Sequence, residues 1–227
     1  MSIGGLQKLT LLDFPGHVAC TVFFQGCNFR CPFCHNTPLL AGGNGIAEEE
    51  ILSFLKKRQG LLDGVAITGG EPLLQPDIED FLKKVKALGF PVKLDTNGSF
   101  PKKLATLIGQ GLVDYVAMDV KSSKKHYPRV AGTDRFLPEV EESVSILLDG
   151  KIPYEFRTTV VKELHCDEDF HEIGQWLQGA DQYFLQNFVD SGHILSPGLH
   201  APERQELERY LSIAKQYIPN TQLRGLE

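Results

Sequence analysis

Short strand-like segments alternate with amphipathic helix-like segments along most of the chain. Runs of β-branched and aromatic residues predict the strands, and an apolar period of 3.6 residues predicts the helices. The predicted strands are 18–25, 64–70, 91–98, 114–121, 154–161 and 182–189, and the predicted helices are 47–59, 76–88, 102–111, 137–149, 167–178 and 202–217. Strands separated by helices form a parallel sheet with right-handed crossovers. Six such units indicate an incomplete barrel or an open doubly wound sheet, which periodicity alone does not separate.

Composition and charge narrow the class of protein. We expect residues 1–227 to form one domain, because no linker-like or low-complexity stretch divides the chain. The net charge of −6 and the scattered Lys and Arg residues argue against a nucleic-acid partner, since phosphate contacts need clustered cations. The chain has no apolar run of about 18 residues and no signal-peptide pattern at its start. We therefore expect no membrane span and a cytoplasmic location.

Polar or glycine-containing motifs stand at the carboxyl ends of nearly all the predicted strands. QGC, TGGEP and DTNG follow the first three strands, MDVK ends the fourth, and QNF ends the sixth. Arg157 lies inside the fifth. In parallel α/β sheets and barrels, the active site lies at this edge of the sheet. The sequence therefore predicts one site assembled from several strands.

Three cysteines lie close together in the segment Cys27-Asn-Phe-Arg-Cys31-Pro-Phe-Cys34. In a reducing compartment, clustered cysteines indicate metal binding or redox chemistry rather than disulfides. Thiolates suit iron–sulfur clusters, and three of them can hold three irons of a [4Fe–4S] cubane while the fourth iron stays open. The alternative is a zinc-stabilised binding module without catalysis. Structural zinc needs four ligands, and His35, next to Cys34, is awkwardly placed to be the fourth.

The cysteine spacing, with an aromatic residue just before the third cysteine, resembles that of the radical S-adenosylmethionine (SAM) superfamily. TGGEP (68–72), DTNG (95–98), MDVK and EFRTTVV extend the resemblance over most of the chain. The resemblance implies a partial (β/α)6 TIM-like barrel of parallel strands. It also implies a [4Fe–4S] cluster on the three cysteines, with SAM chelating the open iron. Reductive cleavage of SAM would give methionine and a 5′-deoxyadenosyl radical that abstracts hydrogen.

The opening segment LTLLDFPGHVACTVFFQGCNFRCPFCHN looks like the start of the glycyl-radical activating enzymes. It looks most like the activators of anaerobic (class III) ribonucleoside-triphosphate reductase, because DFPG (13–16) replaces the Gly-Pro-Gly of the related pyruvate formate-lyase activating enzyme. The resemblance implies hydrogen abstraction from a glycine of the partner enzyme, with flavodoxin or ferredoxin as electron donor. Two alternatives stay open: activation of pyruvate formate-lyase or another glycyl-radical enzyme, and small-molecule chemistry such as that of 7-carboxy-7-deazaguanine synthase.

The resemblance also assigns SAM contacts to residues at the strand ends. These predicted contacts are Phe33, His35, Gly69, Gly70, Glu71, Asp95, Thr96, Asn97, Lys121 and Arg157. Phe33 and His35 would contact the adenine, and TGGEP would cradle the amino group. A charge inside a buried sheet needs a partner, so we expect Lys121 and Arg157 to point into the site and meet the SAM carboxylate.

A monovalent cation is a further implication of the resemblance. Asp95 and Asp119 offer hard oxygen donors at two neighbouring strand ends. Gln186 ends the sixth predicted strand and is expected near SAM. Cys20 alternates with apolar residues and is expected to be a small buried hydrophobe. The sequence assigns no role to the remaining cysteine and two loop histidines: Cys166, His193 and His200.

Overall fold

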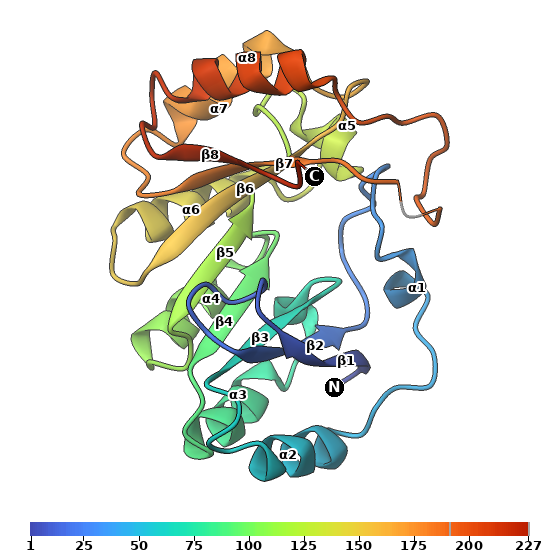
Figure 1. The fold of residues 1–227 in the computed structure, drawn as a ribbon, viewed down its shortest axis with the longest axis vertical. Coiled ribbons are helices and arrows are strands. Elements are labelled where there is room, and N and C mark those ends of the chain that lie inside the picture. The colour runs from blue at the N-terminus through green and yellow to red at the C-terminus, as the bar shows by residue number, and fades with distance from the viewer. Residues whose placement is uncertain (191, 227) are drawn as a thin grey trace.

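The computed structural model describes residues 1–190 and 192–226. Its strands are β1 (Ile3–Thr10), β2 (Ala19–Phe24), β3 (Gly64–Gly69), β4 (Val92–Thr96), β5 (Tyr115–Asp119), β6 (Tyr154–Val160), β7 (Tyr183–Asn187) and β8 (Thr221–Arg224). They form one sheet in chain order. β1 pairs with β2 in the antiparallel sense, and every later pair is parallel. The sheet curves strongly, so that the carboxyl ends of β2 to β7 surround a common space (Figure 1).

Helices fill the connections, and most of them cover the outer side of the curved sheet (Figure 1). They are α1 (Thr37–Leu40), α2 (Glu48–Lys57), the 3₁₀ helix η1 (Pro72–Leu74), α3 (Ile78–Ala87), α4 (Pro101–Gly109), α5 (Tyr127–Ala131), α6 (Leu137–Leu148), α7 (Asp167–Trp176) and α8 (Arg204–Ala214). α3 shows why they form: its apolar face is buried, with acids in the first turn and lysines in the last. Within the described ranges, no helix is long and apolar enough to cross a membrane.

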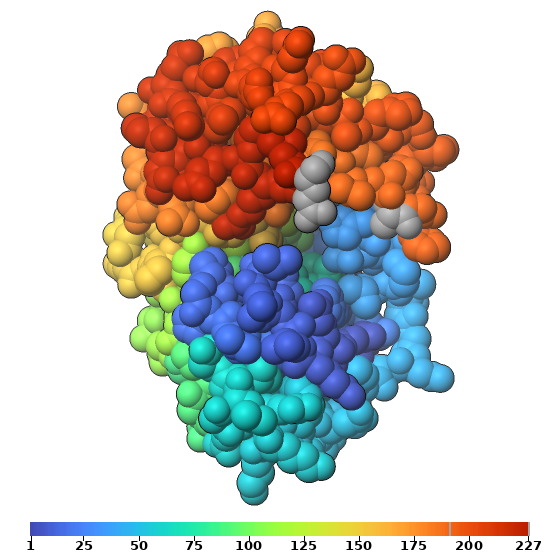
Figure 2. Space-filling model, in the orientation of Figure 1, coloured from blue at the N-terminus to red at the C-terminus, as the bar shows by residue number. Residues whose placement is uncertain are grey.

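The barrel is open on one side. In the described part of the chain, β1 and β8 are the two edges of the sheet and do not pair with each other. The N-terminal segment and the C-terminal segment appear on the same face of the molecule, in blue and red (Figure 2). All six predicted strands and all six predicted helices are present, with ends that differ by a few residues. β1, β8, α1 and α5 were not predicted from the sequence.

A buried ion pair fastens the last strand to the sheet. Glu155 on β6 is 0% exposed and accepts hydrogen bonds from both terminal nitrogens of Arg224 on β8, at 2.7 and 2.9 Å. The Tyr115 hydroxyl donates a third hydrogen bond to Glu155, at 3.0 Å. The guanidinium of Arg224 also lies over the ring of Phe184. This contact adds to the pairing of the four-residue strand β8 with β7.

We predict that Arg224→Met lowers the free energy of unfolding, because it leaves a buried carboxylate without its cation. The expected loss is about 2 kcal/mol, less than for a fully buried pair, since the Arg224 side chain is 35% exposed. Glu155→Gln combined with Arg224→Met should recover part of the lost free energy of unfolding, because it removes the unpaired buried carboxylate. Urea unfolding of both single variants and the double variant measures the coupling. Additive effects of the two substitutions would contradict a direct pair.

Candidate active site

A cavity of about 320 Å³ lies at the carboxyl edge of the parallel strands. Most residues that the sequence predicted for the site line it: Cys27, Cys31, Phe33, Cys34, His35, Gly69, Gly70, Asp95, Thr96, Asn97, Asp119, Lys121, Arg157 and Gln186. Glu71 does not line the cavity and lies fully buried behind its wall. The structure thus brings motifs from six strands to one place, as the strand-end pattern predicted.

The cysteine loop follows β2, and all three of its thiols face the cavity. Cys31 is 8% exposed, and its Sγ lies 3.7 Å from the carbonyl oxygen of Ala131. The backbone N–H of Phe29 donates to Cys27 Sγ at 3.4 Å, and the Asn97 amide donates to the same sulfur at 3.8 Å. N–H donors directed at sulfur stabilise a thiolate that binds metal.

The spacing of the three sulfurs suits a polynuclear cluster better than a single ion. Four sulfurs bound to one zinc ion at about 2.3 Å would lie about 3.8 Å apart. Among the described residues, the three-ligand group with all ligand atoms within 4.8 Å of one another is His126, Cys166 and Asp169, and not the three loop cysteines. Three cysteines around one cavity match the donor set of an iron–sulfur cluster that keeps one iron open.

Burial favours the protonated form of two loop thiols, Cys27 and Cys31, in the metal-free protein. It raises the pKa of Cys31 to about 12, although Lys121 acts in the opposite direction. It also raises the pKa of Cys27, against the backbone hydrogen bond from Phe29. A metal centre that binds here must therefore displace these protons, so its assembly is expected to be favoured at higher pH.

The short helix α5 braces the cysteine loop from behind. The backbone N–H of Arg30 donates to the carbonyl oxygen of Ala131 at 3.0 Å. Gly132 follows with a φ of 67°, and a Cβ at this position would lie 2.1 Å from the carbonyl oxygen of Arg30. This brace was not predicted, because the sequence between 122 and 136 suggested only a loop. The glycine after an apolar turn is the signal that could have revealed it.

The two glycines of TGGEP allow close packing against the cysteine loop. A Cβ on Gly70 would lie 1.9 Å from the carbonyl oxygen of Gly26, the residue before Cys27. The Glu71 N–H donates to that same carbonyl oxygen at 2.9 Å. The Asn36 amide, beyond the last cysteine, donates to the carbonyl oxygen of Gly69 at 3.1 Å. The loop and the turn therefore form one rigid wall of the cavity.

Glu71 joins the TGGEP and DTNG motifs. Its carboxylate accepts hydrogen bonds from the N–H of Asn97 at 2.7 Å, the hydroxyl of Thr96 at 2.9 Å and the N–H of Leu73 at 3.0 Å. Burial raises the pKa of Glu71 to about 7, and the three hydrogen bonds only partly offset this effect. The residue thus supports the cavity wall from inside the protein.

The raised pKa of Glu71 predicts a pH-dependent stability. A carboxyl with a folded-state pKa near 7 and an unfolded value of 4.5 stabilises the fold fully at low pH. That stability is lost as the pH rises through about 7 and amounts to at most about 3 kcal/mol. Glu71→Gln should remove this part of the decline between pH 5 and pH 8, as measured by urea unfolding of the iron-free protein. An identical pH slope in both proteins would refute the assignment.

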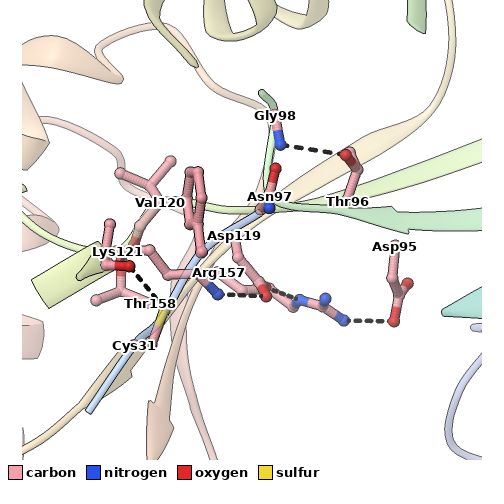
Figure 3. A network of polar contacts seen from close by, with 12 residues as sticks. Cys31, Asp95, Thr96, Asn97, Gly98, Asp119, Val120, Lys121, Arg157 and Thr158 are labelled. Atoms are coloured by element: carbon pink, nitrogen blue, oxygen red, sulfur yellow. Dashed lines mark hydrogen bonds and ion pairs between the residues drawn. The ribbon is translucent and has the colours of Figure 1, made fainter. Parts of the chain in front are cut away.

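Arg157 connects the two aspartates at the strand ends (Figure 3). Its Nη1 donates to Asp95 at 3.2 Å, and its Nε donates to Asp119 at 2.8 Å. Lys121 Nζ donates to the other oxygen of Asp119 at 2.9 Å. Burial works against ionisation of both aspartates, but Arg157 and the neighbouring lysines outweigh it and lower their pKa values. Arg157 and Lys121 do point into the cavity, and protein carboxylates are their partners in this structure.

Two polar features of the site escaped the sequence analysis. Asn28 accepts a hydrogen bond from the Asn97 amide at 3.0 Å and donates to the Ser99 hydroxyl at 2.8 Å, which links the cysteine loop to DTNG. The irregular segment after β7 contacts the cysteine loop, where the Ser196 N–H donates to the carbonyl oxygen of Pro32 at 3.0 Å. It also contacts α1, where Thr37 donates to the carbonyl oxygen of His193. Asn28 stands between two cysteines, so its position in the loop was the available signal.

Residues without a predicted role lie mostly away from the cavity. Cys20 is fully buried in β2, as expected for a small hydrophobe. Cys166 caps the start of α7 together with Asp169. The His200 ring pairs with Glu163 at 2.7 Å on the surface.

Comparisons with known proteins agree with this site. The sequence profile described as "Radical SAM superfamily" matches residues 21–177. A protein of Methanocaldococcus jannaschii that carries the name of a glycyl-radical enzyme activating enzyme, MJ1227, is 33% identical over 99% of this chain and 96% of its own length. The pyruvate formate-lyase-activating enzyme of Clostridium pasteurianum is 29% identical over 92% of this chain and 96% of its own length.

Solved structures confirm the fold. Streptococcus suis SuiB bound to its precursor peptide SuiA superposes with a TM-score of 0.76 at 16% identity, over 95% of this chain and 50% of that one. A domain of a pyruvate-formate lyase-activating enzyme from Bacteroides vulgatus superposes with a TM-score of 0.58 at 16% identity, over 71% and 99%. At such low sequence identity, the structural matches support the partial-barrel fold alone. The sequence matches support the family as well. The chain belongs to the radical SAM superfamily and, within it, to the glycyl-radical enzyme activating enzymes.

Proposed function

We propose that this enzyme generates a glycyl radical on an anaerobic ribonucleoside-triphosphate reductase. Membership of the family implies a [4Fe–4S] cluster and SAM as cofactors and a glycyl-radical enzyme as partner. The observation that carries the proposal is the convergence of three thiols, TGGEP and DTNG on one cavity. DFPG (13–16) in place of Gly-Pro-Gly supports the reductase as the partner.

Cys27, Cys31 and Cys34 would hold the cluster. The N–H donors of Phe29 and Asn97 on Cys27 suit a thiolate ligand, which is what an iron–sulfur cluster needs. When bound and reduced, the cluster supplies the electron that splits SAM into methionine and a 5′-deoxyadenosyl radical. Flavodoxin or ferredoxin, in the cytoplasm, is the electron donor that we propose.

The other walls of the cavity would bind and orient SAM. Gly69 and Gly70 line the cavity with backbone atoms, and their lack of side chains lets this turn pack closely on β2 and the cysteine loop. Phe33 and His35 would pack against the adenine. Lys121 and Arg157 would attract the carboxylate of SAM, with Thr96 and Asn97 beside them. These protein groups fix the position of SAM, and none of them has to act as a general base.

Access for a protein substrate is supported by the open barrel. β1 and β8 leave the sheet unclosed among the described strands, so a glycine-bearing loop of the partner can approach the cavity. The hydrogen atom on the glycine Cα would move to the 5′ carbon, which leaves 5′-deoxyadenosine and a carbon-centred radical on the glycine. We further propose that the whole chain acts as one domain, since its single sheet runs from Ile3 to Arg224.

Electron paramagnetic resonance tests the partner. The reconstituted, reduced protein is incubated anaerobically with SAM and with either the anaerobic reductase or the pyruvate formate-lyase of the same organism. We expect a glycyl radical signal on the reductase and none when its radical-bearing glycine is replaced by alanine. A signal only on pyruvate formate-lyase would transfer the assignment to that partner. Formation of 5′-deoxyadenosine without a radical on either protein would favour a small-molecule substrate.

A further inference from the structure

The ion-pair network at the base of the cavity also contains Lys93. Lys93 on β4 is 2% exposed, and its Nζ donates to Oδ1 of Asp95. Alternate residues of a strand point to the same side of a sheet. Lys93 and Asp95 therefore both point into the barrel, with Lys93 one step further from the carboxyl edge.

With Lys93 included, cations occupy all four carboxylate oxygens of the two aspartates. Asp95 accepts from Lys93 on one oxygen and from Arg157 on the other. Asp119 accepts from Arg157 on one oxygen and from Lys121 on the other. Three positive side chains thus face two negative ones, and the group carries a net charge of +1.

This arrangement does not fit the monovalent cation that the sequence predicted at Asp95 and Asp119. Hard cations bind through oxygen atoms, and the four carboxylate oxygens here already accept protein cations. A sodium or potassium ion would be a fourth positive charge within a few ångströms of three others, among side chains that are mostly buried. Like charges at such distances repel strongly.

We propose that the Lys93 ammonium group takes the place of a bound monovalent cation and makes SAM binding independent of sodium and potassium. Lys93 is then a positioning residue: it neutralises Asp95, which holds the Arg157 guanidinium in line with Asp119. The inference rests on the proposed SAM site but not on the identity of the protein partner.

The test compares three salts of equal ionic strength: sodium chloride, potassium chloride and tetramethylammonium chloride. SAM affinity is measured by calorimetry on anaerobically reconstituted protein, and the melting temperature is measured on iron-free protein. For the wild-type protein, we expect affinities within about twofold in all three salts. We also expect the same melting temperature in all three.

Two Lys93 variants distinguish the effect of losing the positive charge from the effect of opening a space that an ion can enter. Lys93→Ala leaves room for a small ion beside Asp95. It should bind SAM about tenfold more weakly in tetramethylammonium chloride, with recovery in sodium or potassium chloride. Lys93→Met fills the space without a charge and should bind weakly in all three salts. Lys86→Met is the matched control, because Lys86 forms an ion pair with Asp114 outside the cavity, at 2.7 Å.

The proposal is overturned if the wild-type affinity or melting temperature is higher in sodium or potassium chloride than in tetramethylammonium chloride. It is also overturned if Lys93→Ala equals the wild-type protein in tetramethylammonium chloride. Melting of the iron-free protein requires neither SAM nor a partner. Its salt dependence therefore tests whether the site binds a monovalent cation even if the proposed function fails.

Discussion

Replacing any one of Cys27, Cys31 or Cys34 by alanine should abolish 5′-deoxyadenosine formation. The three thiols face one cavity, and the remaining two cannot hold three irons in place. We expect the iron content after reconstitution to fall to background, with loss of the broad visible absorption of the cluster. The rate of SAM cleavage should fall by at least about 100-fold. Iron and sulfide analysis, together with chromatography of the nucleoside product, measures both effects.

Cys166→Ser provides the control for the loop cysteines. Cys166 is also a free thiol, but it caps α7 beside Asp169 and does not line the cavity. Serine preserves the capping group, so this variant should keep its iron and its activity. A Cys34→Ala protein with a full cluster and normal 5′-deoxyadenosine formation would show that the cluster binds elsewhere.

Gly70→Ala should be severely damaging to both stability and cluster binding. The added Cβ would lie 1.9 Å from the carbonyl oxygen and 2.6 Å from the carbonyl carbon of Gly26. Both atoms belong to the backbone that leads into Cys27, so neither can move without shifting the first cysteine. Overpacking against backbone on this scale should lower the free energy of unfolding by about 3 kcal/mol or more. Urea unfolding of iron-free protein and iron content after reconstitution should both reveal the damage.

Gly109→Ala is the matched control for this prediction. Gly109 lies in α4, and an added Cβ there meets no atom within 4 Å. Alanine favours a helix over glycine by about 0.5–1 kcal/mol, so this variant should be as stable as the wild-type protein or slightly more so. If Gly70→Ala matched Gly109→Ala in stability and iron content, the close contact between the turn and the cysteine loop would be wrong.

The strand and helix pattern could be predicted because each parallel strand is apolar and each covering helix is amphipathic. The edge strands lack these signals. β1 (IGGLQKLT) contains two glycines and several polar residues, and only its two end residues are buried. β8 is only four residues long. Their pairing depends on neighbours that are distant in the sequence, so local patterns could not reveal them.

The sequence predicted which motifs form the site, but it did not predict which side chains pair with one another there. The motifs at the strand ends indicated which residues form the site, and nearly all of those residues line the cavity. The register that places Arg157 opposite Asp119 cannot be read from either strand alone. The sequence analysis therefore gave Arg157 a ligand carboxylate as its partner. Lys93 was missed, although the rule that a charge inside a buried sheet needs a partner applied to it as it did to Arg157.

The most direct test of the account follows a hydrogen atom from the partner to the cofactor. The anaerobic reductase is prepared with glycine deuterated at Cα, and the activating enzyme is reconstituted anaerobically, reduced and supplied with SAM. The account predicts 5′-deoxyadenosine with one deuterium and a glycyl radical on the reductase, both of which are absent with the Cys31→Ala variant. 5′-Deoxyadenosine without deuterium, and no radical on the reductase, would contradict it.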